Sequence, residues 1–481
     1  MKPITLRRTK IIATLGPASS DIDMLKKMIT AGVDVVRLNF SHGKAEDHAK
    51  RIEVVREAAK QCNKEIGIMA DLQGPKIRIS KFKNGKVILA VNSSFVLDAD
   101  FDKENGDEHQ VGIDYKNLPH DLHTGDVLLL DDGRLVFDVE KVEHNKIFCK
   151  VRVGGELSNN KGINRQGGGL SAKALTEKDK ADLITAVGLG VDYIAISFPR
   201  SAKDIIEARE LIQKAGGDMG IVAKIERTEA VEAIDEIIKA SDAVMVARGD
   251  LGVEIGDAEL PAVQKHIIHR SRSLDKAVIT ATQMMESMVT NAIPTRAEVF
   301  DVANAVLDGS DVVMLSAETA TGKHPDLVVE AMARVCLGAE KQPSTRLSRH
   351  RVECHFQRVD EAIAMATMYA ANHFNIKAII TLTESGATPL WMSRIRSGIP
   401  IYALTRNQKT QRKMTLFRGV YPVYFPHSEH DSAELTQKRS IEELQSRNIV
   451  SKGDYVILTR GDAMGHMGST NTMKIVRVEE K

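Results

Sequence analysis

The chain has 481 residues, more than one hydrophobic core usually serves, which predicts about three domains. Apolar residues make up 43% and charged residues 27% of the composition, so a sizeable core can form and wholesale disorder is excluded. The formal net charge is only +1, with basic and acidic residues interleaved, which argues against a dedicated nucleic-acid-binding protein.

Cysteine usage and apolar runs indicate the compartment. Cys62, Cys149, Cys336 and Cys354 are widely spaced and form no CxxC pair, which is typical of reduced thiols rather than of disulfides or a zinc site. The basic start of the chain leads into a short apolar run without the core of a signal peptide, and no later run is long enough to span a bilayer. We therefore expect a cytoplasmic protein without a membrane partner.

Short apolar runs alternate with amphipathic stretches, the pattern that produces parallel sheets. Helical periodicity occurs at 45–60, 202–214, 229–239, 295–307 and 326–340, and helix caps are expected at Thr176 and Thr228. Eight strands are predicted, at 9–16, 33–40, 66–74, 191–198, 221–226, 243–250, 277–284 and 311–319. Because eight parallel strands close a (β/α)₈ TIM barrel, we predict an α/β fold built on one.

Two further domains are predicted around this barrel. Strand-like alternation and turn signals such as Asn84-Gly85 predict an inserted β-barrel lid domain at 73–168, between barrel parts at 1–72 and 169–343. The glycine-rich return at 162–169 suits a hinge, although an inert loop fits the local sequence equally well. A polar linker at 341–351 then precedes a C-terminal α/β regulatory domain at 344–481.

Polar side chains gather at the predicted carboxyl ends of the barrel strands, where the active site of such a barrel forms. Any one of them could simply close the barrel mouth with a salt bridge. A lysine and a glutamate two residues apart in an apolar strand are, however, seldom buried without a paired, metal-bound or functional reason. The set comprises Arg37, Asn39, Ser41, Asp71, Lys224, Glu226, Arg248, Gly249, Asp250, Thr280, Thr282, Ser316 and Glu318.

Two carboxylates of this set, Glu226 and Asp250, suit a magnesium ion that is shared with an anionic substrate. Magnesium prefers one or two protein carboxylates and completes its shell with water and substrate oxygens. The nearby lysine and arginine would balance charge on a transferring phosphoryl group. The residues therefore indicate phosphoryl transfer that depends on a divalent metal ion.

Six motifs, in this order along the chain, closely resemble those of pyruvate kinases. They are 9–19 (TKIIATLGPAS), 37–43 (RLNFSHG), 224–226 (KIE), 245–252 (MVARGDLG), 281–284 (ATQM) and 314–319 (MLSAET). The likeness covers essentially the whole chain, including the insertion and the C-terminal region. It implies transfer of the phosphoryl group of phosphoenolpyruvate to ADP, with protonation of the resulting enolate to pyruvate.

The resemblance also assigns roles to single residues. Glu226 and Asp250 match the ligands of Mg²⁺ or Mn²⁺, and Lys224 matches the lysine that stabilises the transferred phosphoryl group and the enolate oxygen. Arg37 would contact that phosphoryl group. The remaining matches are the substrate-carboxylate pocket of Gly249, Asp250 and Thr282, and the nucleotide-phosphate neighbours Asn39, His42 and Arg78. A proton relay through Thr282, Ser316 and Glu318 is a hypothesis.

One departure concerns the family's monovalent-cation site, which Asn39, Ser41, Asp71 and the Leu72 carbonyl match. In the run 71–76 (DLQGPK), Lys76 stands where potassium-requiring members carry glutamate. An ammonium group could supply the missing positive charge, so we predict that potassium is not required. Alternatively, Lys76 is only a surface residue on the lid stem.

A second departure concerns allosteric control. The loop with Thr383, Glu384, Ser385, Gly386 and Thr388 offers amides and hydroxyls to a phosphate, although helix capping would explain its sequence equally well. In the family this region binds a sugar phosphate or nucleotide. The loop 461–468 (GDAMGHMG) lacks the Trp and Arg used for the second phosphate of fructose bisphosphate, which favours AMP or a sugar monophosphate. The resemblance further implies a homotetramer.

Two alternatives remain at this point. A lyase or aldolase that acts on pyruvate-like enolates could use the same metal, carboxylates and barrel. A catalytically silent sensor of phosphorylated metabolites would keep the C-terminal loop but should have lost Lys224 or a metal carboxylate, and these are present.

Overall fold

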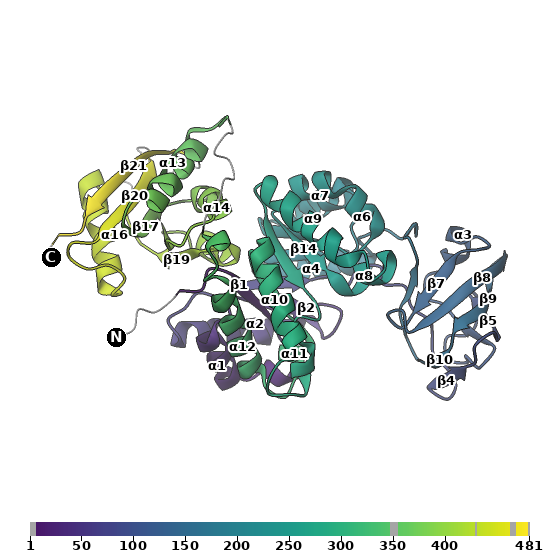
Figure 1. The fold of residues 1–481 in the computed structure, drawn as a ribbon. Helices are drawn as coiled ribbons and strands as arrows, with labels where there is room; N and C mark the ends of the chain where they lie inside the picture. Colours follow the sequence, from purple (N-terminus) through teal and green to yellow (C-terminus); the bar gives the residue numbers. More distant parts are fainter. Residues whose placement is uncertain (1–5, 347–354, 429–430, 462–467, 480–481) are drawn as a thin grey trace.

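A closed barrel of eight parallel strands forms the centre of the computed structural model, which describes residues 6–346, 355–428, 431–461 and 468–479 (Figure 1). Around the barrel the strand order is β1-β16-β15-β14-β13-β12-β3-β2. The strands are β1 (Lys10–Thr14), β2 (Val35–Asn39), β3 (Gly67–Asp71), β12 (Tyr193–Ile196), β13 (Gly220–Ile225), β14 (Ala243–Ala247), β15 (Ala277–Ala281) and β16 (Val312–Leu315). Each overlaps a predicted strand, so the predicted (β/α)₈ fold is confirmed.

Helices cover the outside of the barrel, and four of them match the periodicity predicted at 45–60, 202–214, 295–307 and 326–340. The helices are α1 (Ile22–Ala31), α2 (Ala45–Gln61), α4 (Glu177–Gly188), α5 (Ala202–Lys214), α6 (Thr228–Glu232), α7 (Ile234–Ala240), α8 (Arg248–Ile255), α9 (Leu260–Ser273), α10 (Arg296–Asp308), α11 (Ala317–Ala320) and α12 (Pro325–Ala339), with short 3₁₀ turns η1 (Pro17–Ser19) and η2 (Glu286–Val289). Thr176 caps α4 as expected, by accepting a hydrogen bond from the Asp179 amide.

The helix expected at 229–239 and its cap at Thr228 were wrong in detail. The segment forms two helices, α6 and α7, separated at Ala233, and Thr228 is the first helical residue of α6. Its backbone N–H donates to Glu254 Oε2 at 3.0 Å, so a carboxylate from α8 satisfies the first free amide of α6.

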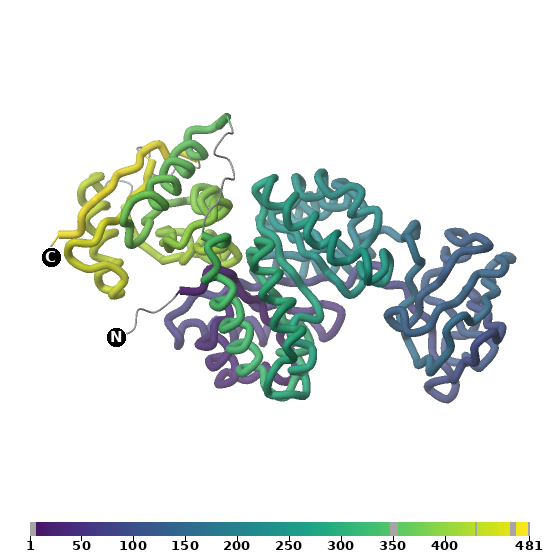
Figure 2. The backbone as a smooth tube through the Cα atoms, in the orientation of Figure 1, coloured from purple at the N-terminus to yellow at the C-terminus, as the bar shows by residue number. Residues whose placement is uncertain are grey.

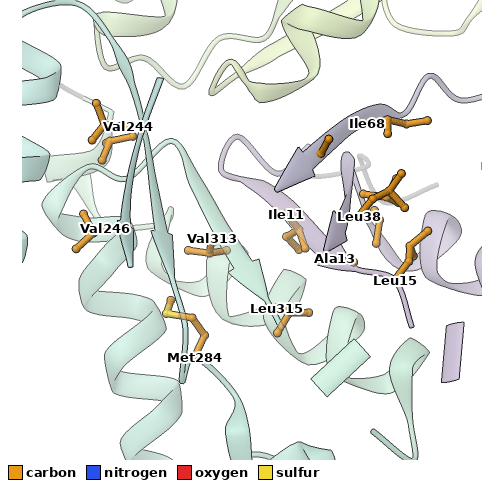
Figure 3. Packing of buried hydrophobic residues seen from close by; sticks show 14 of the residues in the cluster. Ile11, Ala13, Leu15, Leu38, Ile68, Val244, Val246, Met284, Val313 and Leu315 are labelled. Carbon is orange, nitrogen blue, oxygen red and sulfur yellow. The ribbon is translucent and has the colours of Figure 1, made fainter. Parts of the chain in front are cut away.

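The barrel strands are buried on both faces, which explains their continuous apolar runs. Ile11 and Ala13 of β1 face the helices together with Val244, Val246 and Val313 (Figure 3). Between them, Ile12 points into the barrel and packs in a second cluster with Met245, Ile279 and Met314. Because successive side chains of a strand alternate sides, one run of residues serves two cores.

The interior of the barrel is completed by a residue from the C-terminal part of the chain. Leu416, in the 3₁₀ turn η4 (Met414–Leu416), is fully buried in the same cluster as Ile12, and the adjacent Phe417 packs against that cluster. Tyr193 of β12 fixes the approach by donating its hydroxyl to the Lys413 carbonyl at 2.7 Å. The floor of the barrel is therefore a contact between domains.

The insertion between β3 and α4 consists of a six-stranded mixed sheet, β11-β7-β8-β9-β5-β6, and a two-stranded sheet, β10-β4. Its elements are β4 (Lys86–Leu89), β5 (Ser94–Asp98), β6 (Gln110–Gly112), α3 (Leu118–Asp121), β7 (Val127–Leu130), β8 (Leu135–Glu143), β9 (Lys146–Val153), β10 (Gly155–Ser158) and β11 (Ile163–Arg165). Isolated bridges pair Arg78 with Gly162 and Ile79 with Ile113. The stem of the insertion thus joins the two edge strands of the larger sheet and curls it into a barrel-like shape.

The C-terminal domain is a five-stranded sheet of order β19-β18-β17-β20-β21 with helices packed on it. It lies at one end of the barrel, and the insertion lies at the other, as the course of the chain also shows (Figures 1 and 2). Its elements are η3 (Pro343–Thr345), α13 (Val359–His373), β17 (Ile376–Leu382), α14 (Ala387–Arg394), β18 (Ile401–Thr405), α15 (Gln408–Lys413), β19 (Val420–Tyr424), α16 (Ala433–Ser446), β20 (Tyr455–Gly461) and β21 (Thr470–Arg477).

Two further observations concern the predicted compartment. Cys62, Cys149 and Cys336 are free thiols, whereas Cys354 lies outside the described residues. Within the ranges given above, no helix combines the length and the apolar character that crossing a bilayer requires.

We expect Leu416→Ala to lower the free energy of unfolding by about 2–5 kcal/mol, because it leaves a cavity in the floor of the barrel. Urea unfolding monitored by circular dichroism measures this loss. Leu435→Ala on α16 is the matched control, because Leu435 is an exposed leucine of the same domain and should change stability by less than about 0.5 kcal/mol. Equal effects of the two substitutions would contradict the role given to Leu416.

Candidate active site at the carboxyl end of the barrel

A buried lysine lies at the centre of the polar residues that the strand ends bring together. Lys224, near the end of β13, is 9% exposed, and its Nζ lies 3.2 Å from Asp71 Oδ1 and 3.0 Å from Glu226 Oε1. The same Nζ donates a hydrogen bond to Ser197 Oγ at 2.6 Å. These groups come from three neighbouring strands, β3, β12 and β13, so the barrel topology itself assembles the cluster.

The charges in this cluster stabilise one another unequally. Burial alone would lower the pKa of Lys224, but Asp71 and Glu226 outweigh it and raise that pKa, which keeps the ammonium charged. Burial would raise the pKa of Asp71, but Lys224 and Arg37 outweigh it and lower that pKa. For Glu226, burial and repulsion from Asp250 and Asp71 exceed the attraction of Lys224, so its pKa is raised.

Glu226 and Asp250 are the residues that could hold a divalent metal ion. Their carboxylates interact strongly enough for Asp250 to raise the pKa of Glu226, and a dication between like charges removes that repulsion. In the described part of the chain, no three acidic, histidine or cysteine side chains gather as a complete protein ligand set. Magnesium suits such a pair, because two protein carboxylates leave its other coordination positions for water and substrate oxygens.

The loop after β15 meets the start of α8 beside Asp250. The Gly249 amide donates to Thr282 Oγ1 at 3.0 Å, and Thr282 Oγ1 donates to the Ala281 carbonyl at 2.7 Å. Thr282 has a φ of 65° and Gln283 a φ of 54°, which are costly values for non-glycine residues and are typical of functional sites. Neutral donors and one hydroxyl therefore converge next to the two carboxylates.

Arg248 holds this strained loop in place. Its Nε donates to the Ala281 carbonyl at 3.1 Å, and its Nη1 lies 2.8 Å from both carboxylate oxygens of Asp301 on α10. The guanidinium is committed to these partners, so Arg248 supports the loop rather than reaching the Lys224 cluster.

Glu318 plays a comparable part beneath β16. Its carboxylate accepts hydrogen bonds from the Ser316 amide at 2.6 Å and from the Met285 amide at 3.2 Å. The predicted residues Thr282, Ser316 and Glu318 thus lie on two loops that a single buried carboxylate connects.

Arg37 lies beside the cluster, and the residues expected near the nucleotide lie at the end of β2, in the loop after it and on the stem of the insertion. Arg37 Nε donates to Asp71 Oδ2 at 2.6 Å, and its Nη1 donates to Thr14 Oγ1 at 3.1 Å. Asn39 Oδ1 accepts from the Ser41 amide at 3.1 Å, and His42 is exposed in the following loop. Arg78 lies on the stem of the insertion, where its Nη1 donates to the Asn160 carbonyl at 2.9 Å.

Lys76 extends from the same stem to Asp250, one of the two carboxylates that could hold a metal ion. Its Nζ lies 3.0 Å from Asp250 Oδ1, and its Cε is so close to Gly162 that a β-carbon there would lie 3.3 Å away. Lys76 is therefore not simply a solvated surface residue. Its partner in the structure is Asp250, and Asp71 is paired instead with Lys224 and Arg37.

Sequence reasoning missed Ser197 and the residues that anchor the return from the insertion. Ser197 Oγ donates to the Leu72 carbonyl at 2.7 Å while accepting from Lys224, so it joins two strand ends. As a polar residue at the end of a predicted strand, it could have been found by the rule that found the others. Gly169 of the predicted hinge donates its amide to Glu229 Oε1 at 2.6 Å, which no local pattern signals.

The predicted effector loop joins β17 to α14. Thr383 Oγ1 accepts from the Gly386 amide at 2.9 Å, and Thr388 Oγ1 lies 2.8 Å from Thr470 Oγ1 on β21. Gly386, with a φ of 83°, is the N-cap of α14, and Ser385 Oγ accepts a hydrogen bond from the Ala387 amide at 3.4 Å, so Ser385 contributes to helix capping as the alternative expected. Most of loop 461–468 lies outside the described residues.

Comparison with known proteins identifies the family. A model of the pyruvate kinase barrel domain matches residues 6–329, and a model of the pyruvate kinase alpha/beta domain matches residues 361–476. The chain belongs to the pyruvate kinase family. Its enzyme class is that of the family, a phosphotransferase of glycolysis (EC 2.7.1.40).

Curated relatives match over nearly the full chain. The chain is 58% identical to pyruvate kinase II of Salmonella typhimurium, a match that covers 98% of this chain and 99% of the relative. It is 57% identical to pyruvate kinase of Haemophilus influenzae, with 97% of each chain covered. Identity to pyruvate kinase of Sporosarcina psychrophila is 41%, over 98% of this chain and 80% of the relative. The lyase and sensor alternatives are therefore not supported.

Proposed function

We propose that this chain transfers the phosphoryl group of phosphoenolpyruvate to ADP, giving pyruvate and ATP, under the control of a phosphorylated metabolite. The observation that carries the proposal is the buried Lys224 ammonium between Asp71 and Glu226, with a third acid, Asp250, that raises the pKa of Glu226. A fixed positive charge beside two acids is suited to a transferring phosphoryl group with its metal ion.

Glu226 and Asp250 would hold Mg²⁺ or Mn²⁺, which when bound supplies positive charge close to the substrate oxygens. Lys224 then provides a charge for the phosphoryl group and for the enolate oxygen, and Arg37 adds a second. The raised pKa of Lys224 supports this role, because the ammonium stays charged at neutral pH.

The substrate carboxylate would bind the amides of Gly249 and Asp250 and the Thr282 hydroxyl. The contact between the Gly249 amide and Thr282 supports a common pocket, and amides in the first turn of α8 lack partners within the helix. Asn39, His42 and Arg78 would bind the nucleotide phosphates. Because Arg78 lies on the stem of the insertion, movement of that domain would bring it toward the site.

The enolate carbon would receive its proton through Thr282, Ser316 and Glu318. The bonds of Glu318 to the Ser316 and Met285 amides support the relay, because they hold the two participating loops together. The positions of these three residues would determine the face of the enolate that receives the proton.

Lys76 would replace the monovalent cation of potassium-requiring relatives. Its contact with Asp250 supports this assignment, because it places an ammonium next to the proposed metal site.

The effector would be AMP or a sugar monophosphate, bound at Thr383, Glu384, Ser385, Gly386 and Thr388. Glu384 is paired with Arg406 at 3.1 Å, so an arriving phosphate would compete for that arginine. A homotetramer would offer a rigid-body route between this loop and the barrel. The domain boundaries, the cytoplasmic location and the absence of a nucleic-acid or membrane partner stay predictions.

We expect Lys224→Met to lower kcat by at least about 10²-fold, because it removes charge stabilisation made in the transition state. An assay that couples pyruvate formation to lactate dehydrogenase, with and without ADP, measures this. Lys239→Met, an exposed position on α7, should retain full activity. Pyruvate formation without a nucleotide acceptor would contradict kinase activity.

Thr282→Val should slow proton exchange into pyruvate more than it slows phosphoryl transfer. Equal losses in the two half-reactions would reject the relay.

We expect full activity of the wild-type enzyme without potassium, and a potassium requirement after Lys76→Glu. The substitution places a third acid near Asp250 and Glu226, so a monovalent cation becomes necessary. The assay is run in tetramethylammonium buffer with and without added potassium. A many-fold loss of wild-type rate in the potassium-free buffer would rule out the replacement.

We expect AMP or ribose 5-phosphate to lower the phosphoenolpyruvate concentration needed for half-maximal rate, and fructose 1,6-bisphosphate to be ineffective. Thr383→Ala should weaken the response to the monophosphate without changing the maximal rate, because Thr383 orders the loop. Activation by the bisphosphate alone would show that the inference from loop 461–468 is wrong.

A further inference from the structure

Five arginines surround one small cavity where the floor of the barrel meets the C-terminal domain. Arg8 precedes β1, Arg272 lies on α9, Arg394 ends α14, and Arg396 and Arg418 belong to loops of the C-terminal domain. The cavity has a volume of about 20 Å³, enough for one particle the size of a water molecule. Of the residues that line it, none belongs to the effector loop 383–388.

Two of these arginines are fully paired. Arg394 lies 2.6 Å and 2.9 Å from the two carboxylate oxygens of Asp311, and these side chains are 1% and 3% exposed. Arg8 lies 3.5 Å from Glu340 and donates to the carbonyls of Thr345 and Ser397 at 2.8 Å and 2.6 Å. The carboxylates of Asp311 and Glu340, two buried acids beside the cavity, are therefore already paired.

The other three arginines carry donors without partners. Arg418 is 8% exposed, and its Nη2 is buried without a hydrogen-bond partner, while its Nη1 reaches backbone carbonyls only at 3.4 Å and 3.5 Å. Arg396 has a buried Nε in the same condition. Arg272 is half-buried, and its side chain makes no hydrogen bond or ion pair with the described residues, so only the charges of neighbouring groups act on it.

Positive charge is in excess around this cavity. Burial, followed by repulsion from Arg396, Arg394 and Arg418, lowers the pKa of Arg272 to about 10, which still leaves it charged at neutral pH. A further acid close by, Asp308, is paired with Lys265 at 2.5 Å through Oδ1, while its Oδ2 is buried without a hydrogen-bond partner. Buried charged donors without partners are costly, and an opposite charge among them offsets that cost.

We propose that this cavity binds one small monovalent inorganic anion of the chloride class, held by Arg272, Arg396 and Arg418. A water molecule has a suitable size but leaves the positive charge uncompensated. A tetrahedral oxyanion such as phosphate is too large for the cavity. The bound anion joins α9 of the barrel to two loops of the C-terminal domain, so it stabilises the contact between domains independently of the proposed catalytic function.

Bromide replaces chloride in such sites and can be located by anomalous diffraction. Crystals of the intact enzyme grown in sodium bromide should show an anomalous peak among the guanidinium groups of Arg272, Arg396 and Arg418. Phosphate-grown crystals should show no tetrahedral density there. Solvent density without an anomalous signal at saturating bromide would overturn the proposal, because it would mean that water alone occupies the cavity.

Stability in solution provides an independent test. At equal ionic strength, chloride should raise the midpoint of thermal unfolding above that in gluconate by about 2–4 °C, because the anion binds only the folded state. Arg272→Met should abolish this shift. Arg270→Met, on the same helix but paired with Asp235 at 2.5 Å, should retain it. An equal chloride shift in both variants would place the anion elsewhere and reject the site; if Arg272→Met does not fold, the bromide experiment on the wild-type enzyme decides.

Discussion

The structure depends above all on one buried ammonium group shared by two acids. Removing Lys224, Asp71 and Glu226 from water is costly, and their mutual attraction compensates only when geometry and additional hydrogen bonds are good. The barrel provides both, because β3, β12 and β13 end side by side and Ser197 joins Lys224 to the Leu72 carbonyl. The imbalance left on Glu226 by Asp250 is what makes this structural cluster suitable for a cation and a phosphorylated substrate.

Buried charge is stabilised differently at the opposite end of the barrel, where its floor contacts the C-terminal domain. At the mouth, acids and bases are matched within hydrogen-bond distance. At the floor, five arginines line one small cavity, and among the described residues Arg394 and Arg8 are the two of these five that pair with carboxylates. Guanidinium groups tolerate burial because their several donors can also use backbone carbonyls, as Arg8 does with Thr345 and Ser397. The mouth of the barrel is therefore suited to a cation, whereas the floor is suited to an anion.

Much of the fold and site could be predicted because barrel strands leave a strong local signal. Strands buried on both faces appear in the sequence as apolar runs, and polar residues such as Lys224 and Glu226 mark the end of the barrel where the candidate site lies. What failed depends on long-range contacts. Thr228 resembles a cap in the sequence, but it is the first residue of α6, and its amide donates to Glu254 from α8. The contact of Lys76 with Asp250 depends on where the insertion places its stem. The cavity lined by five arginines combines residues from widely separated parts of the chain. Neither leaves a periodic pattern in the sequence.

The position of Leu416 has a consequence for how the protein is made. The last barrel strand ends at Leu315, yet the inner cluster of the barrel includes Leu416, on a later domain. During synthesis on the ribosome, all eight strands emerge before the side chain that seals them. The nascent barrel therefore exposes an apolar opening until the final quarter of the polypeptide arrives, which is the interval when chaperones can bind it and premature termination would leave it prone to aggregate.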